Sequence, residues 1–136
     1  MHQEDARAPS KTDLNRTAVL EFYRLGLAGR QPVEAFSRFV APWFIEHKPD
    51  LENPTREGSA AFLQELMLEL PGATWEVVRT IAEGDFVFLH ARFVPTPGAL
   101  PYAIADVFRL HEGLIVEHWD VVAGPSANPK NTHSRF

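Results

Sequence analysis

The sequence predicts an α+β fold in which three N-terminal helices pack on one side of a curved, mostly antiparallel sheet. Apolar residues follow helical spacing as far as Leu70, and from Thr74 onward they alternate as in strands. The 136 residues suffice for one domain with a sizeable buried core. We expect residues 1–12 to form a flexible N-terminal arm and residues 13–136 to form that single domain. A sheet wrapped around helices in this way can enclose a conical pocket.

The helices are predicted from apolar periodicity together with residues that favour helix ends. Asp13 is expected to cap the first helix, and Gly29 fits its end. Pro32 suits the first turn of a second helix, which Pro42 closes. Residues 43–47 are expected to form a short strand ahead of the third helix. The apolar face of that third helix comprises Ala61, Phe62, Leu66, Met67 and Leu70.

Four long antiparallel strands are expected in the second half of the chain, because the apolar residues there alternate between turn signals. The expected strands are residues 74–81, 86–94, 102–110 and 114–122. A loop with three prolines separates the second of these strands from the third. The last two strands form a hairpin whose connection is His111-Glu112-Gly113.

The composition excludes several classes of function. The net charge is −5 and the basic residues do not cluster, so nucleic-acid binding is not expected. The absence of cysteine excludes disulfides, thiolate metal ligands and a cysteine nucleophile. No segment carries the apolar run of a membrane span or a signal peptide, so no membrane partner is expected and the cytoplasm is the default location.

The final hairpin carries an aspartate deep inside each strand, Asp106 and Asp120. Strand interiors are depleted in aspartate, and a buried carboxylate is unfavourable unless it is paired, hydrogen-bonded or protonated. The turn decides whether the two carboxylates share a face. With a three-residue loop, Asp106 lies opposite His118 and both aspartates line one face. With a two-residue turn they lie on opposite faces, unless a bulge restores the shared face.

If the face is shared, the two carboxylates and the nearby imidazoles form an acid–base site in an apolar pocket. Burial and a second carboxylate raise the pKa of one member of such a pair. One group can then donate a hydrogen bond to a developing oxyanion while the other abstracts a proton next to a carbonyl. The alternative is structural: Asp106 pairs with Arg109 or a backbone amide, or an Asp106–His118 pair satisfies two buried groups.

Five segments share their residues with one known family. They are residues 19–23 (Val-Leu-Glu-Phe-Tyr), 44–49 (Phe-Ile-Glu-His-Lys-Pro), 81–85 (Ile-Ala-Glu-Gly-Asp), 106–110 (Asp-Val-Phe-Arg-Leu) and 113–121 (Gly-Leu-Ile-Val-Glu-His-Trp-Asp-Val). Through them the chain resembles the SnoaL-like branch of the nuclear transport factor 2-like superfamily. The resemblance implies a cone-shaped α+β barrel with a deep apolar pocket. Polyketide cyclases, ketosteroid isomerases, limonene epoxide hydrolases and binding proteins without catalysis share that fold.

The resemblance also implies roles for individual residues. Asp120 stands at the place of the acid–base aspartate of the cyclases, and Tyr23 and Asp106 resemble the oxyanion hole of ketosteroid isomerase. His47 stands where that isomerase has its aspartate base. We therefore predict Asp120, Asp106, His47 and His118 as catalytic residues. The predicted substrate-binding residues are Tyr23, Trp43, Phe88, His90, Arg92 and Phe108.

Three interpretations of function follow. The first is a cofactor-independent enzyme that carries out aldol-type cyclisation, or an isomerase or lyase reaction, on a small, largely apolar carbonyl compound. The second is a binding protein for an apolar ligand, because the fold does not fix the function. The third is a metal site, with ligands from His47, His90, Asp106, His118 and Asp120. A homodimer is also expected, with an apolar outer face supplied by Trp75, Val77 and Trp119.

Overall fold

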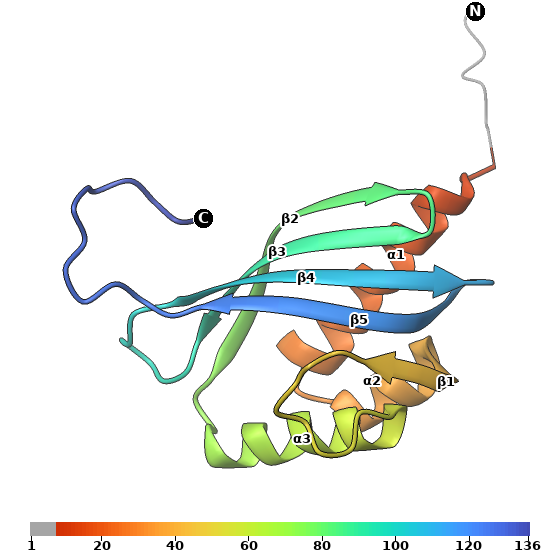
Figure 1. The fold of residues 1–136 in the computed structure, drawn as a ribbon, viewed down its shortest axis with the longest axis horizontal. Helices are drawn as coiled ribbons and strands as arrows, with labels where there is room; N and C mark the ends of the chain where they lie inside the picture. Colours follow the sequence, from red (N-terminus) through yellow and green to blue (C-terminus); the bar gives the residue numbers. More distant parts are fainter. Residues whose placement is uncertain (1–7) are drawn as a thin grey trace, which may run out of the picture.

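The computed structural model describes residues 8–136, and Figure 1 shows the order of its elements. The helices of this described part are α1 (Lys11–Tyr23), its π-helical continuation η1 (Arg24–Ala28), α2 (Pro32–Phe39) and α3 (Arg56–Glu69). Its strands are β1 (Val40–Glu46), β2 (Thr74–Glu83), β3 (Phe86–Val94), β4 (Tyr102–His111) and β5 (Leu114–Ala123). Within the same residues, no helix has the length and apolar character needed to cross a membrane.

The strands form one mixed sheet in the order β1-β5-β4-β3-β2. β1 runs parallel to β5, and the other neighbouring strands are antiparallel. The helices lie against one face of this curved sheet, with α2 and α3 next to β1 (Figure 1). Because β1 and β2 are the two edges, the sheet stays open instead of closing into a hydrogen-bonded barrel. The prediction of an α+β fold with a curved, mostly antiparallel sheet is confirmed.

The start of α1 differs from the sequence prediction. Ser10, not Asp13, caps the helix, because the Ser10 Oγ accepts a hydrogen bond from the Asp13 backbone N–H at 3.1 Å. The helix therefore begins at Lys11, inside the segment predicted to be a flexible arm. Residues 1–7 of that predicted arm lie outside the described residues. At its other end the helical segment reaches Gly29 through η1, as predicted.

Pro42 does not end α2, contrary to the prediction. The helix ends at Phe39 because Val40 is extended, with φ −113° and ψ 135°, and Pro42 lies inside β1. A proline lacks the N–H that a central strand needs, but β1 is an edge strand and has a ladder on one side only. The short strand expected at residues 43–47 is therefore longer and begins earlier.

The turn and register of the β4–β5 hairpin determine whether the side chains of Asp106 and Asp120 lie on the same face of the sheet. Glu112 and Gly113 form a two-residue turn, with φ of 50° and 80°. A register shift near the turn adds one residue to β5, which is a β-bulge. Beyond the bulge, Asp106 pairs directly with Asp120, so both side chains point to the same face. The three-residue loop is wrong, and the two-residue turn with a bulge is what the chain adopts.

The two faces of the sheet have different surroundings. The inward face packs against the helices, where Phe22 of α1 meets Phe36 and Phe108 edge-on with ring centroids 5.1 and 5.9 Å apart. The outward face carries exposed apolar side chains at Ile81, Phe86, Phe88 and Val121. The inward face therefore contains the core and every side chain of the pocket that the sheet supplies.

Trp75 does not belong to the outward face, contrary to the prediction. It is 7% exposed, lies against Phe93 with ring centroids 4.9 Å apart, and lines the internal pocket. Val77 also packs against the core. Trp119 does point outward, where it stacks on His47 at 4.6 Å. The homodimer stays a prediction.

Candidate active site

A cavity of about 230 Å³ lies between the inward face of the sheet and the helices. Its walls are mostly apolar and include Phe36, Phe44, Phe62, Leu66, Trp75 and Phe108. The volume is somewhat below the roughly 300–1,000 Å³ of pockets that hold drug-sized ligands. The cavity therefore suits a small, largely apolar molecule.

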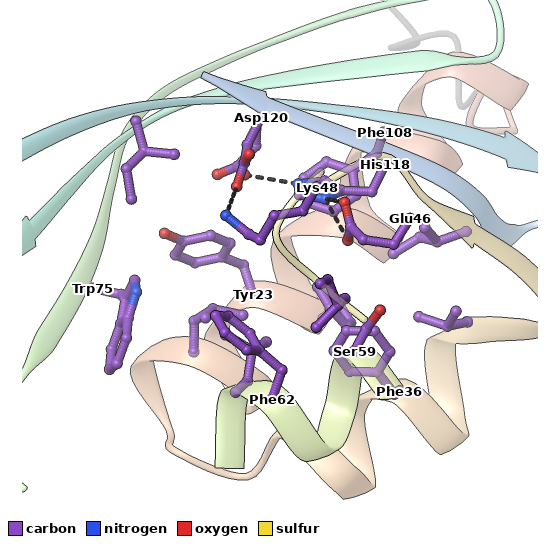
Figure 2. A pocket seen from close by; sticks show the side chains of 18 of the residues that line it. Tyr23, Phe36, Glu46, Lys48, Ser59, Phe62, Trp75, Phe108, His118 and Asp120 are labelled. Atoms are coloured by element: carbon purple, nitrogen blue, oxygen red, sulfur yellow. Dashed lines mark hydrogen bonds and ion pairs between the residues drawn. The ribbon is translucent and has the colours of Figure 1, made fainter. Parts of the chain in front are cut away.

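Charged side chains gather on the sheet side of this cavity (Figure 2). Asp106 comes from β4 and His118 and Asp120 from β5, and all three point inward because of the hairpin register. Glu46 joins them from β1, since parallel pairing places it beside His118. Lys48 follows two residues after Glu46 and lines the same cavity. We call these five residues the polar wall.

His118 is held between two carboxylates. Its Nε2 is 2.8 Å from Asp106 Oδ1, and its Nδ1 is 2.9 Å from both carboxylate oxygens of Glu46. Burial by itself lowers the pKa of His118, but the hydrogen bonds and charges of Asp106 and Glu46 outweigh it and raise the pKa to about 10. At neutral pH the ring is therefore a cation that donates one N–H to each carboxylate.

Asp120 forms the second ion pair of the polar wall. The Lys48 Nζ donates to Asp120 Oδ2 at 2.9 Å, and the two side chains are 28% and 14% exposed. The same ammonium lies 6.0 Å from the centre of the Phe62 ring. Within the described residues, Asp120 is thus linked to a flexible side chain on a loop, whereas Asp106 is linked to a rigid, buried imidazolium.

Tyr23 approaches the polar wall from the helical side (Figure 2). The residue is 4% exposed, and its position on α1 follows from the apolar stripe that packs this helix on the sheet. Burial, and then the negative charge of Asp106, raise the pKa of the Tyr23 hydroxyl well above its ordinary value. The hydroxyl stays protonated at any working pH and can donate a hydrogen bond into the cavity.

The structure brings together Tyr23, Asp106, Phe108, His118 and Asp120 from the predicted site. It does not bring His47 there, because His47 and Glu46 point to opposite sides of the chain. The His47 Nε2 lies 2.6 Å from Glu117 Oε2, and the ring stacks on Trp119. A base at this position would face away from the cavity.

Four predicted substrate-binding residues also lie outside the cavity. Trp43 is 61% exposed and Phe88 is 48% exposed. His90 contacts Arg79 and stacks on Phe136, and Arg92 lies over the same Phe136 ring at 5.6 Å. For the three residues of β3 the physical reason is strand alternation, since residues 88, 90 and 92 share the outward face while Leu89 and Ala91 are buried.

The polar wall also contains the one group of potential metal ligands in the described residues. Ligand atoms of Asp106, His118 and Asp120 lie within 4.8 Å of one another. A metal-bound imidazole must be neutral and have a free lone pair. Both ring nitrogens of His118 instead donate to carboxylates, and the ammonium of Lys48 sits beside Asp120. This donor set does not suit a divalent ion.

Sequence reasoning missed Glu46, Lys48 and Ser59 as residues that line the cavity. A signal for Glu46 and Lys48 exists in the sequence: Phe44 is apolar and buried, and alternation along β1, continued two residues beyond its end, predicts that both residues share its inward face. The partnership of Glu46 with His118 has no local signal, because parallel pairing joins residues that are far apart in the chain.

A family model matches this chain over most of its length. The model describes a SnoaL-like domain and matches residues 19–118. That range includes Tyr23, Glu46, Lys48, Asp106 and His118, and it ends two residues before Asp120. No curated protein matches the sequence at a significant level.

Solved structures of similar proteins have the same fold. A candidate polyketide cyclase from Bacillus cereus superposes with a TM-score of 0.72 at 19% identity, covering 88% of this chain and 80% of that one. A candidate ketosteroid isomerase from Kribbella flavida gives 0.70 at 20% identity, covering 91% and 88%. IdmH, a candidate polyketide cyclase from Streptomyces antibioticus, gives 0.65 at 22% identity, covering 79% and 91%. At these identities the likeness concerns the fold.

Proposed function

The chain belongs to the SnoaL-like domain family, and we propose that it is a cofactor-independent acid–base enzyme acting on a small, largely apolar carbonyl compound. The observation that carries the proposal is the meeting of a carboxylate, Asp120, and a protonated phenol, Tyr23, in one apolar cavity. An apolar cavity with a few convergent polar groups is the ordinary form of a small-molecule site.

In the proposed reaction, the Tyr23 hydroxyl donates a hydrogen bond to the substrate carbonyl oxygen. The Asp120 carboxylate takes a proton from the carbon next to that carbonyl. The electrons of the broken C–H bond form a C=C bond, and the carbonyl π electrons move to the oxygen, which becomes an enolate. In a cyclisation, the enolate carbon attacks a second carbonyl carbon of the same molecule, and Asp120 gives its proton to the alkoxide oxygen that forms. In an isomerisation, the enolate is conjugated with a C=C bond, and Asp120 gives the proton to the far carbon of that bond. Cyclisation and isomerisation share the first step.

The other members of the polar wall position these two groups. The imidazolium of His118 holds both Asp106 and Glu46 in hydrogen bonds. Asp120 is paired instead with the flexible side chain of Lys48, so it is the carboxylate that can most easily change its partner. Lys48 has a flexible side chain that can leave Asp120 and follow the negative charge to the enolate oxygen. We propose no cofactor for this chemistry.

A second candidate function is the binding of an apolar ligand without catalysis. It is favoured by one observation, which is that Asp106, His118 and Asp120 all have protein partners. Groups that are paired in this way can serve only to stabilise the fold and to shape the cavity.

One experiment separates the two candidates. The ketone α-tetralone carries exchangeable protons on the carbon next to its carbonyl, and it is small and largely apolar. In D₂O, the proposed enzyme speeds the replacement of these protons by deuterium, which proton NMR follows on the ketone itself. A protein that only binds α-tetralone becomes saturated with it, but the ketone then exchanges its protons no faster than in buffer without protein. That result would overturn the catalytic proposal.

A further inference from the structure

Ser59 lines the cavity opposite the polar wall, and its hydroxyl is buried without a hydrogen-bond partner in the described residues. The residue lies on α3, is 3% exposed and lines the cavity. Its Oγ is buried and has no hydrogen-bond partner within residues 8–136. Figure 2 shows Ser59 on the helical side, away from the sheet that carries Asp120 and His118. A buried hydroxyl without a partner is unfavourable, so this position calls for an explanation.

The local structure fixes Ser59 in this position. Thr55 caps α3 by accepting a hydrogen bond from the Gly58 N–H at 3.1 Å, and the Ser59 N–H donates to the Thr55 carbonyl at 2.9 Å. Gly58 packs so closely on Asn53 that an added Cβ would lie 2.0 Å from the Asn53 carbonyl oxygen. The backbone of Ser59 is therefore satisfied and held, and its hydroxyl alone remains free.

Ser59 is the one polar residue among the α3 residues that line the cavity. The other α3 residues that line the cavity are Phe62, Leu63 and Leu66. Among the α3 residues of the lining, Ser59 alone carries a polar side chain, so its hydroxyl is the one group there that could pair with a ligand oxygen. A hydroxyl both donates and accepts, so it can pair with a ligand hydroxyl or carbonyl.

We infer that Ser59 is a second polar anchor, which binds an oxygen at the far end of a ligand whose carbonyl meets Tyr23 and the polar wall. This inference rests on the proposed function, and it narrows the ligand class. The ligand is a compact apolar carbonyl compound with a second hydroxyl or carbonyl oxygen across its skeleton. A ligand with one oxygen leaves Ser59 unpaired and binds less tightly.

The test compares α-tetralone with the hydroxy-α-tetralones that carry one phenolic hydroxyl at different positions of the aromatic ring. Their dissociation constants are measured by calorimetry with the wild-type chain, Ser59→Ala and Thr80→Val. Thr80 is a matched control, because its hydroxyl is also buried without a partner in the described residues but lies outside the cavity lining.

The inference predicts that at least one hydroxylated isomer binds the wild-type chain about three- to tenfold more tightly than α-tetralone, as one hydrogen bond provides. Ser59→Ala removes this advantage, so that the hydroxylated isomers bind this variant no more tightly than α-tetralone does, while Thr80→Val keeps the advantage. The inference is overturned if no isomer gains affinity or if the gain survives in Ser59→Ala. In either case, binding of α-tetralone itself leaves the proposed function standing. If no tetralone binds the wild-type chain, both fail together.

Discussion

Asp106 lies directly opposite Asp120 across β4 and β5, so two carboxylates share one face of the sheet inside an apolar cavity. Like charges that face each other across strands are destabilising. Two cations resolve the conflict, because His118 pairs with Asp106 and Lys48 pairs with Asp120. The two aspartates therefore differ in setting: one is fixed by a buried ring, and the other is held by a mobile ammonium.

Glu46→Gln tests whether the His118 cluster stabilises the fold. The substitution removes the charge on one side of the buried imidazolium, and we expect the free energy of unfolding to fall by about 1.5–3 kcal/mol. Urea unfolding measures the change. The control is Glu34→Gln, which breaks the exposed ion pair with Arg38 and should change stability by less than about 1 kcal/mol. Equal effects of the two substitutions would contradict this role.

The stability of the chain should fall with rising pH in a defined window. The pKa of His118 is raised from 6.5 to about 10, so its stabilising contribution is complete below about 6.5 and is lost as the pH rises through about 10. Urea unfolding across this window should show a decline in the wild-type chain that His118→Gln lacks. A wild-type stability that stays level or rises relative to the variant would show that the ring is not held as a cation.

Tyr23→Phe tests the proposed hydrogen bond to the carbonyl oxygen. Loss of one such donor slows enolate formation by about 100-fold or more, because the charge develops on that oxygen in the transition state. Deuterium exchange of α-tetralone measures the rate, and calorimetry shows that the ketone still binds. The ring itself remains in place, so the variant should keep its fold. An exchange rate equal to that of the wild-type chain would remove Tyr23 from the mechanism.

Tryptophan fluorescence should report which aromatic residues meet a ligand. Trp75 lines the cavity, whereas Trp43 is 61% exposed and Trp119 stacks on His47 at the outward face. Binding of α-tetralone should change the emission of the wild-type chain and of Trp43→Phe, but not that of Trp75→Phe. The reverse pattern would place the ligand outside the cavity.

Local patterns were enough to predict most of the elements and the polar strands of this fold. Alternation along β3 places Phe88, His90 and Arg92 on one face, and the structure agrees. Alternation does not say which face meets the helices, so the sequence alone predicts these three outward residues as contacts to a substrate. The inward face is fixed by packing between segments that are distant in sequence.

Register limits the prediction of the site in the same way. The hairpin sequence is compatible with two turns, and the bulge that aligns Asp106 with Asp120 has no local signature. The parallel pairing of β1 with β5 is also non-local, and it alone brings Glu46 to His118 and turns His47 away. The family resemblance supplied the roles of Tyr23 and Asp120, but not the arrangement of this wall.

Deuterium exchange of α-tetralone by Asp120→Asn tests the central claim most directly, because Asp120 is proposed to take the proton. The account predicts that the folded variant still binds the ketone but exchanges its protons about 100-fold more slowly, or worse, than the wild-type chain. Asp85→Asn is the matched control: Asp85 lies in the β2–β3 turn, paired with Lys11 and away from the cavity. It should exchange at the wild-type rate. Undiminished exchange by Asp120→Asn would contradict the account.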